Sequence, residues 1–275
     1  MNWVAALPMY NVTPALAGDW RVLLDHVHQR LRPWLDARGD TLAIVDPEAS
    51  LQEFWLQEFW LSEDLLLSQT CGYPLVKALA GRVQLVTTPV FTIDGCEAGD
   101  YHSVLVTRAA AKVASLAQCR GLRAAYNTAD SNSGMNLLRS AVAPLAGGRP
   151  FFASVIETGG HLASLQALQD DRADIAAIDC VSFAFVLDQL PDLALGLVEI
   201  GTTRSAPGLP LIASKRVPPE GIDALLNALA GAVANDRALA KRLKLDGFTR
   251  RPLDHYASIL EIEKDAVERG YPRLA

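Results

Sequence analysis

The 275-residue chain has no long hydrophobic run and no cluster of basic residues, and both absences narrow its class. No stretch reaches the roughly 18 consecutive apolar residues that a membrane-spanning helix needs, so we expect no membrane insertion. The formal net charge of −6 argues against nucleic-acid binding, because contacts to phosphates need grouped Lys and Arg. Half of the residues are apolar, which is enough to bury a sizeable core in one large domain or two smaller ones.

The chain also lacks the motifs of several common catalytic sites. It contains no Gly-x-Ser-x-Gly elbow, no His-Glu-x-x-His, no Walker loop and no Gly-x-Gly-x-x-Gly after a predicted strand. The five histidines are scattered, and the closest two, His26 and His28, point to different faces of a predicted helix. We therefore expect a protein that is not an enzyme and holds neither a metal nor a cofactor.

Cysteines are few, and their spacing fits no metal site, because Cys71, Cys96, Cys119 and Cys180 are all more than twenty residues apart. They are either small buried hydrophobic residues or include a Cys71–Cys96 disulfide, which would indicate an oxidising compartment. The N-terminus lacks the charged region and the apolar stretch of an export signal. A cytoplasmic location and removal of a signal both stay open.

Short apolar runs alternate with helical patterns, which is the order of an α/β fold. The patterns predict strands at 3–7, 42–45, 83–87, 103–106, 122–126, 151–156, 174–178, 194–200 and 209–213. They predict helices at 19–32, 74–80, 109–117, 134–146, 161–169, 219–234, 236–243 and 254–268. The chain is expected to cross twice between two lobes, with 1–90 and 200–275 in lobe I and 91–199 in lobe II. Two crossings imply a hinge, and an interlobe cleft is a natural place for a small ligand.

Two polar turns between a strand and a helix are the most informative segments. The first has the sequence Asp-Ser-Asn-Ser-Gly at residues 130–134, and the second has Thr-Gly-Gly-His at residues 158–161. The first backbone N–H groups of a helix have no intrahelical partner, and such helix starts bind anions. The sequence thus predicts two anion-facing helix starts within one α/β unit.

One oddity is a tandem copy in which residues 51–55 and 56–60 both read Leu-Gln-Glu-Phe-Trp. A period of five matches neither a helix nor a strand, and repeat architectures use units of roughly 20 to 50 residues. The copy is interpreted either as a short sequence duplication or as an exposed aromatic patch for a partner, made of Phe54, Trp55, Phe59 and Trp60.

Several segments in this order resemble the PhnD-like phosphate and phosphonate solute-binding proteins of ABC transporters. They are Leu-Pro-Met-Tyr at 7–10, Ser-Gln-Thr-Cys-Gly-Tyr-Pro at 68–74, the turns at 130–134 and 158–161, and Asp-Ile-Ala-Ala-Ile-Asp at 174–179. The resemblance covers most of residues 3–215. It implies a type II periplasmic-binding-protein fold, with two α/β lobes, two hinge strands and an oxyanion held in the interlobe cleft.

The resemblance also implies roles for residues of the first turn. Ser131 and Ser133 would donate hydroxyls, the amides of Ser133 and Gly134 would donate N–H groups, and Asn132 would add an amide donor. Gly134 would let the backbone approach the ligand. The alternative is ordinary helix N-capping by this turn. Asp130 is a complication, because a carboxylate that caps the helix competes with an anion for the same amides.

Four further residues are candidate ligand contacts, His161, Tyr10 and Tyr73 by the same resemblance and Asp179 by its position in the predicted α/β lobe. His161 would face the ligand oxygens as a cation or as a neutral donor, or else be structural. Tyr10 and Tyr73 would line the cleft from lobe I, or else be surface turn residues. Asp179, at the carboxyl end of a predicted strand, would accept from a ligand or fix a cleft side chain, or else cap the next helix.

One stretch departs from the family pattern. Aminophosphonate binders tend to carry an acidic residue in the second hinge region, where this chain reads Ala-Pro-Gly-Leu-Pro at residues 206–210. An amine-bearing phosphonate is therefore a doubtful ligand.

The prediction from the sequence is a solute-binding protein that captures a small oxyanion, phosphate- or phosphonate-like, for an ABC permease. The alternatives are an enzyme of cofactor biosynthesis on the same fold and a cytoplasmic ligand-sensing module. The family resemblance implies a periplasmic location.

Overall fold

The computed structural model describes residues 1–45 and 53–275, which form two compact units. Unit 1 comprises Met1–Thr92, Glu97–Gly99 and Gly208–His255, and unit 2 comprises Ile93–Cys96, Asp100–Pro207 and Tyr256–Ala275. The division into lobes expected from the sequence stays a prediction. It differs from these units in one large segment, because the last twenty residues pack with unit 2.

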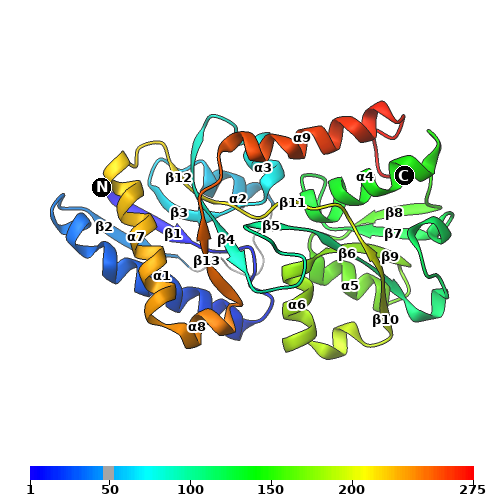
Figure 1. The fold of residues 1–275 in the computed structure, drawn as a ribbon, viewed down its shortest axis with the longest axis horizontal. Helices are drawn as coiled ribbons and strands as arrows, with labels where there is room; N and C mark the ends of the chain where they lie inside the picture. Colours follow the sequence, from blue (N-terminus) through cyan, green and yellow to red (C-terminus); the bar gives the residue numbers. More distant parts are fainter. Residues whose placement is uncertain (46–52) are drawn as a thin grey trace. The chain divides into compact units, whose positions relative to one another are not determined.

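Unit 1 is built on a six-stranded sheet with the order β13-β4-β12-β3-β1-β2 (Figure 1). Strand β1 is parallel to β2 and β3, whereas β12 is antiparallel to β3 and β4, and β13 is antiparallel to β4. The strands are β1 (Asn2–Ala6), β2 (Thr41–Ile44), β3 (Leu65–Gln69), β4 (Val83–Phe91), β12 (Leu211–Ser214) and β13 (Leu245–Thr249). The helices are α1 (Pro14–Asp36), α2 (Glu53–Trp60), α3 (Gly72–Val76), α7 (Pro219–Asn235) and α8 (Arg237–Arg242).

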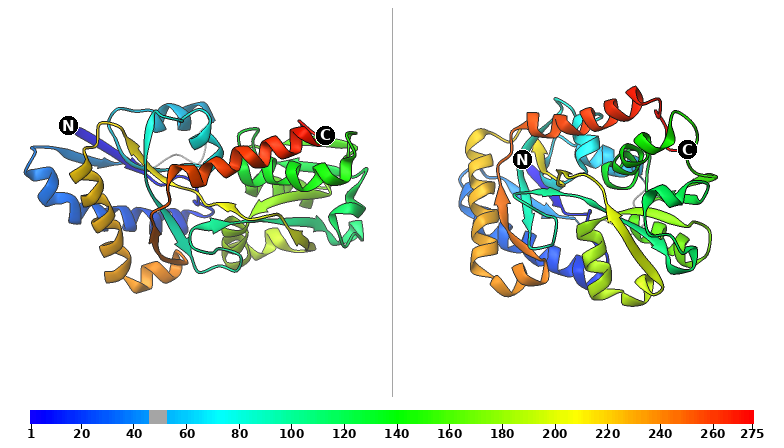
Figure 2. Two further views of the ribbon diagram at one scale, coloured as in Figure 1. Left: turned by 45° about the horizontal axis from the view of Figure 1, so that its top comes forward. Right: turned by 45° about the vertical axis from the view of Figure 1, so that its right-hand side comes forward.

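Helix α1 shows how the sequence defines an element of unit 1. The Thr13 hydroxyl accepts the Leu16 N–H at 3.2 Å, and Pro14 stands in the first turn, where its missing N–H costs nothing. Apolar residues at spacings of three and four, from Leu16 to Leu35, are buried. The helix is therefore longer at both ends than the 19–32 segment predicted. It lies beside α7 in both views of Figure 2.

Unit 2 is built on a five-stranded sheet with the order β10-β6-β9-β7-β8. Strands β8, β7 and β9 are parallel to one another, whereas β6 is antiparallel to β9 and β10 is antiparallel to β6. A short ribbon pairs β5 with β11. The strands are β5 (Asp100–Tyr101), β6 (Ser103–Arg108), β7 (Arg123–Tyr126), β8 (Ser154–Glu157), β9 (Ile175–Asp179), β10 (Leu197–Thr202) and β11 (Ala206–Pro207). The helices are α4 (Leu137–Ala146), α5 (His161–Gln169), α6 (Cys180–Gln189) and α9 (Leu253–Glu268), of which α9 begins in unit 1.

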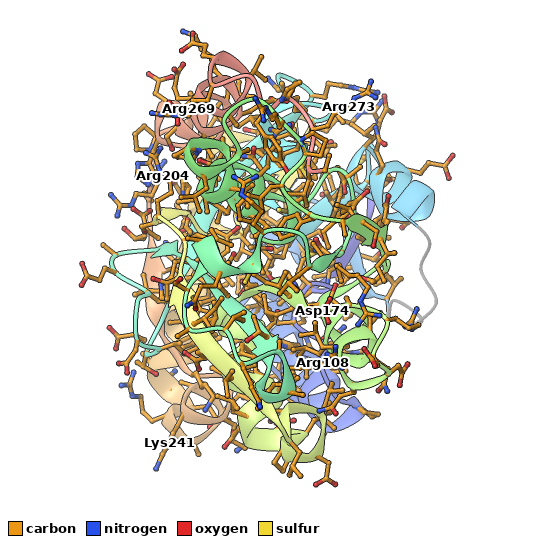
Figure 3. All side chains as sticks on the ribbon, turned by 90° about the vertical axis from the view of Figure 1, so that its right-hand side faces the viewer. Arg108, Asp174, Arg204, Lys241, Arg269 and Arg273 are labelled. Atoms are coloured by element: carbon orange, nitrogen blue, oxygen red, sulfur yellow. The ribbon has the colours of Figure 1, made fainter. Side chains whose placement is uncertain are left out.

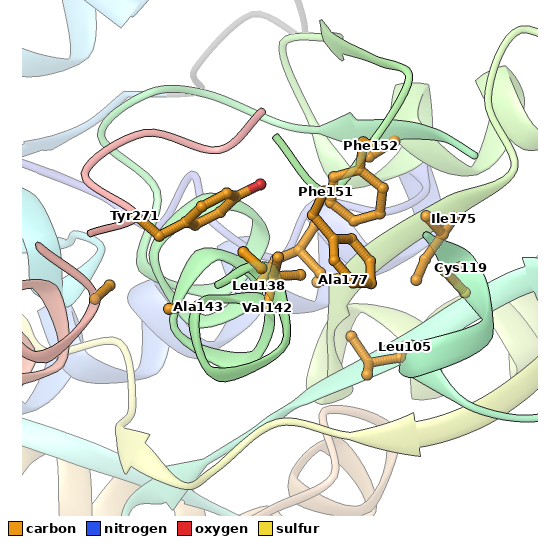
Figure 4. Packing of buried hydrophobic residues seen from close by; sticks show 13 residues of the cluster. Leu105, Cys119, Leu138, Val142, Ala143, Phe151, Phe152, Ile175, Ala177 and Tyr271 are labelled. Atoms are coloured by element: carbon orange, nitrogen blue, oxygen red, sulfur yellow. The ribbon is translucent and has the colours of Figure 1, made fainter. Parts of the chain in front are cut away.

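The core of unit 2 explains why the C-terminal segment belongs to it. Leu138 and Val142 of α4 pack with Phe151, and Tyr271 from the C-terminal segment joins the same cluster (Figure 4). The buried Arg139 also donates to the Pro272 carbonyl oxygen at 2.9 Å. Burying the Tyr271 ring, which is 3% exposed, supplies the hydrophobic free energy that fixes this segment.

A charge cluster stands just before the first residue of β9. Asp174 forms ion pairs with Arg123, at 2.9 Å, and with Arg108. Figure 3 labels Asp174 and Arg108. The hydrogen bonds from Arg123 hold the pKa of Asp174 far below its ordinary value. This cluster lies at the strand end opposite to Asp179.

Some predicted elements are wrong. Residues 109–117 form no α-helix. A short 3₁₀ turn at Ala109–Ala111 ends at Lys112, which has a left-handed φ of 51°, and none of the three alanines is buried. Strands β3, β5, β11 and β13 and helix α2 were not predicted.

The structure also bears on the Cys71–Cys96 disulfide and on the exposed aromatic patch that the sequence left open. All four cysteines are free, so the Cys71–Cys96 disulfide is wrong. Cys119 is fully buried, and burial raises the pKa of its thiol to about 11. Of the tandem copy, residues 51 and 52 lie outside the described residues. Trp60 is 5% exposed and donates its indole N–H to the Gln69 carbonyl, so it is not part of an exposed patch.

Within the described residues, no helix combines the length and the apolar character that crossing a membrane requires.

Candidate functional site

The candidate site is built where three neighbouring parallel strands of unit 2 end. Strand β7 ends at Tyr126, β8 at Glu157 and β9 at Asp179, and a helix begins shortly after each one. The carboxyl ends of parallel strands meet at one edge of a sheet, where α/β proteins bind ligands. Three helix starts therefore share this edge.

The first helix start is the segment Ser131–Gly134, which we call the serine turn. Ser131 has an extended backbone and its hydroxyl accepts the Gly134 N–H at 3.0 Å, so Ser131 caps the helix. The following residues Asn132–Asn136 form one turn of π-helix before α4. Such turns often occur at functional sites.

The side chain of Asn132 is held inside the protein. Its amide nitrogen donates to the Tyr101 hydroxyl at 3.1 Å, and its oxygen accepts from Asn136 at 2.9 Å. Asn132 is fully buried. These bonds fix the π-turn, and the proposed ligand contact of Asn132 stays a prediction.

The second helix start is the turn at Thr158–His161, which is tied to the loop that precedes the serine turn. Thr158 N–H donates to the Tyr126 carbonyl at 2.9 Å, and Gly159 N–H donates to the Asn127 carbonyl at 2.8 Å. Gly159 has a φ of 89°, which favours glycine. His161 is the first residue of α5.

The two turns meet through side chains as well. The Ser133 hydroxyl lies 2.8 Å from His161 Nε2 and 3.4 Å from the Ser131 hydroxyl. Ser131 and Ser133 are each 4% exposed. The sequence predicted both turns, and the structure brings Ser133 and His161, 28 residues apart, into contact.

His161 is a neutral group in this environment. Burial lowers the pKa of its imidazole to about 4, because the charged form loses its hydration. Its Nδ1 is buried and has no hydrogen-bond partner among the described residues. Of the two protonation states expected from the sequence, the neutral donor is the one favoured at neutral pH.

The Ser133–His161 pair has a spare hydrogen-bond donor in either histidine tautomer. If Ser133 donates to Nε2, the N–H at Nδ1 is left over. If instead Nε2–H donates to Ser133, the serine hydroxyl proton is left for the Ser131 hydroxyl, 3.4 Å away, or for a third group. The pair therefore has one donor that the hydrogen bond between Ser133 and His161 does not use.

The third helix start differs, because its own carboxylate fills it. One oxygen of Asp179 accepts the N–H groups of Val181 at 2.8 Å and Ser182 at 3.1 Å. Asp179 is 2% exposed. The helix-cap interpretation is thus observed, and a ligand contact for Asp179 stays a prediction.

The other carboxylates near the serine turn do not cap it. Asp130 accepts the Thr128 hydroxyl at 2.7 Å. Glu157 accepts hydrogen bonds from the Tyr126 hydroxyl at 3.0 Å and from the Ala129 N–H at 3.3 Å. Burial, together with the hydrogen bond between Tyr126 and Glu157, raises the pKa of Tyr126. Asp130 therefore does not cap this helix, because Ser131 holds the cap position.

Tyr10 and Tyr73 both belong to unit 1 and are buried, which overturns their interpretation as surface turn residues. Tyr10 is 2% exposed, and its ring packs against Trp20 and edge-on against Phe91 at 5.3 Å. Tyr73 is 8% exposed, with the Lys77 ammonium 5.1 Å from its ring centroid. Their roles toward a ligand stay predictions.

Sequence reasoning missed residues that shape the serine turn. A Cβ on Gly134 would stand 2.0 Å from Asn127 Oδ1, so Gly134 makes room for this side chain rather than only for a ligand. Asn127 Oδ1 is buried and has no hydrogen-bond partner in the part of the chain that the structure describes. Ser103 donates its hydroxyl to the Ser133 carbonyl at 3.0 Å. The position of Asn127 directly after β7 is the sequence feature that could have indicated its role.

In the part of the chain that the structure describes, no three His, Cys, Asp or Glu side chains form a group that could hold a metal ion.

Solved structures share this fold over almost the whole chain. The structure matches the binding-protein component of an ABC phosphonate transporter from Pseudomonas aeruginosa with a TM-score of 0.78 and 16% identity, covering 98% of this chain and 88% of that one. It matches PhnD1 from Prochlorococcus marinus, in complex with methylphosphonate, with a TM-score of 0.74 and 15% identity, covering 97% and 98%. A protein from Xanthomonas citri bound to ATP matches with a TM-score of 0.67 and 16% identity, covering 97% of both chains. The class is thus the mixed α/β fold of type II periplasmic binding proteins, as predicted.

The sequence then narrows the class to a family. Residues 62–256 match the family model described as ABC transporter, phosphonate, periplasmic substrate-binding protein. The chain therefore belongs to the family of phosphonate-binding periplasmic proteins of ABC transporters, which confirms the resemblance. A comparison with curated protein sequences finds no match.

Proposed function

We propose that this chain binds a small tetrahedral oxyanion, phosphonate- or phosphate-like, at the serine turn and His161, and delivers it to an ABC permease. The observation that carries the proposal is the Ser133–His161 pair, whose hydroxyl and imidazole lie 2.8 Å apart at two helix starts. Helix starts attract anions, and the pair has a donor to spare.

The neutral state of the site favours a ligand that brings its own charge. The side-chain partners of Ser131, Ser133 and His161 among the described residues are neutral groups. Hydrogen bonds from neutral donors to an ionised acceptor are short and strong in a buried site. An anion would therefore gain more here than a neutral ligand of the same shape.

We also propose that the ligand lacks an amine. The stretch at residues 206–210, Ala-Pro-Gly-Leu-Pro, carries no acidic residue, and Ala206, Pro207 and Leu209 are buried. An ammonium group would find no carboxylate partner in this stretch. Methylphosphonate and inorganic phosphate are accordingly the first probes. A position of the ligand between two lobes remains a prediction.

Calorimetric titration of methylphosphonate and of inorganic phosphate into the protein tests the proposal. We expect saturable binding of at least one of them, and recovery of the unchanged ligand after incubation. A converted product would instead favour the cofactor-biosynthesis enzyme, and no binding of either probe would count against the oxyanion site.

Substitution at Ser133 tests the position of the site. Ser133→Glu places a carboxylate where the anion is proposed to bind, so binding should be abolished by like-charge repulsion. Ser133→Gln, of the same size and neutral, is the matched control and should retain measurable binding. Equal affinities for wild type and Ser133→Glu would make the serine turn only a helix cap.

A further inference from the structure

Two cysteines distant in sequence are in contact within unit 2. Cys96 Sγ lies 3.4 Å from Cys180 Sγ, although 84 residues separate them along the chain. Both sulfurs are free thiols. A disulfide needs the sulfurs at about 2.05 Å, so a shift of little more than an ångström would join them.

The backbone holds the two cysteines in this position. Ser103 of β6 pairs with Asp179 of β9, and the Cys180 N–H donates to the carbonyl of His102 at 3.1 Å. The His102 ring in turn lies against Gly95, where an added Cβ would come within 1.8 Å of it. One residue thus contacts the neighbour of Cys96 and binds the backbone of Cys180.

The two thiols differ in access to solvent. Cys96 is partly exposed, whereas Cys180 is 3% exposed. The hydrogen bond with Cys96, followed by burial, raises the pKa of the Cys180 thiol. An external reagent therefore reaches Cys96 first, and Cys180 stands behind it.

We propose that Cys96 and Cys180 form a redox-active dithiol that is oxidised by small disulfides such as glutathione disulfide. The Cys96 thiolate attacks one sulfur of the external disulfide, which forms a mixed disulfide and releases one glutathione thiol. Cys180 then attacks Cys96, which forms the Cys96–Cys180 bond and releases the second glutathione thiol. The protein loses two electrons and two protons, and the external disulfide gains them.

The disulfide would join the segment 93–96 to the start of α6. Cys96 ends the segment 93–96, which belongs to unit 2 and is followed by residues 97–99 of unit 1. Cys180 is the first residue of α6, directly after the cap Asp179. Oxidation would thus attach a chain crossing to one helix start of the candidate site's sheet edge.

The test is incubation of the full chain with glutathione disulfide, alkylation of the remaining thiols and peptide mapping by mass spectrometry. We expect the loss of two thiols, a linked peptide pair containing Cys96 and Cys180, and reversal by a reductant. Cys71 and Cys119 should stay alkylatable after unfolding. A stable glutathione adduct on Cys96 without the link, or no reaction at either cysteine, would overturn the proposal.

Variants define the order of the two steps. Cys180→Ser should stop at a glutathione adduct on Cys96, and Cys96→Ser should take up little glutathione at the buried Cys180. Cys71→Ser is the matched control and should oxidise like wild type. Gly95→Ala, which pushes against the His102 ring, should lower the linked fraction at a given time; an unchanged fraction would contradict the positioning by His102. If a variant fails to fold, peptide mapping of the wild-type protein still tests the proposal.

Discussion

The serine turn and the start of α6 are two helix starts that are capped differently, the first by a neutral hydroxyl and the second by a carboxylate. Both follow parallel strands of one sheet and both need acceptors for the first helical N–H groups. At α6 the Asp179 carboxylate accepts two of them, at 2.8 and 3.1 Å. At the serine turn the neutral Ser131 hydroxyl accepts one, at 3.0 Å. A capping carboxylate cancels the positive end of the helix dipole, whereas a hydroxyl leaves it for a ligand.

The comparison identifies which helix start is suited to an anion. The sequence predicted two anion-facing helix starts, the serine turn and the turn before His161, and it gave Asp179 as an acceptor toward a ligand or as a helix cap. Charge separates Asp179 from the two turns, because an anion beside this carboxylate would meet a like charge. The serine turn and His161 are therefore the stronger pair.

Among the substitutions that test the cap comparison, the largest effect is expected from making the first helix start resemble the third. Ser131→Asp keeps a good cap, since Asp and Ser are nearly equal at this position, but adds a negative charge. We expect methylphosphonate affinity to fall about 100-fold or more by calorimetry, with the stability nearly unchanged. Ser131→Asn, a neutral variant of the same shape, should keep most of the affinity. A similar loss in both variants would show that shape, not charge, decides.

His161→Ala tests whether the second turn contributes to oxyanion binding. Removing a hydrogen bond to an ionised ligand oxygen should weaken binding by roughly 1.5–3 kcal/mol, as measured by calorimetry. The loss should appear in affinity more than in melting temperature. A change well under this range would make His161 a packing residue.

The converse change at the third helix start should have a smaller effect. Asp179→Ser replaces the charged cap by a hydroxyl, so we expect a loss of about 1 kcal/mol in the free energy of unfolding. Denaturant titration measures this loss, and oxyanion affinity should change little. A large fall in affinity would instead place Asp179 against the ligand.

The last prediction concerns the pH dependence of stability. The pKa of His161 is about 4 in the folded protein, below its ordinary value of about 6.5. Between these values the unfolded chain binds a proton that the folded chain does not, so stability should decrease as the pH falls from about 6.5 to about 4. Thermal melts of wild type and His161→Gln across this window test it, and identical pH profiles would contradict it.

Local patterns predicted much of the fold. Apolar runs and the polar turns gave β7, β9 and the start of α5, because burial on both faces and helix capping leave a mark within a few residues. The alanine-rich segment after β6 misled, since helix propensity without a buried face forms no stable helix. Strand β3 shows no alternation to mark it, because all five of its residues are buried.

Long-range contacts were beyond local patterns. The Ser133–His161 bond depends on β7 lying beside β8, and the Cys96–Cys180 contact depends on the pairing of β6 with β9. The fit of Asn127 against Gly134 depends on a side-chain position that spacing does not encode. The sequence therefore located the turns, whereas the fold decides which groups meet.

The most direct test of the oxyanion site is a crystal structure of the protein with arsenate, a tetrahedral oxyanion whose arsenic atom gives an anomalous signal. We predict an arsenic peak with oxygens within about 3.2 Å of the Ser133 hydroxyl or of His161 Nδ1. An ordered arsenate elsewhere, with both of these groups free of it, would show that the serine turn and His161 are not the oxyanion site.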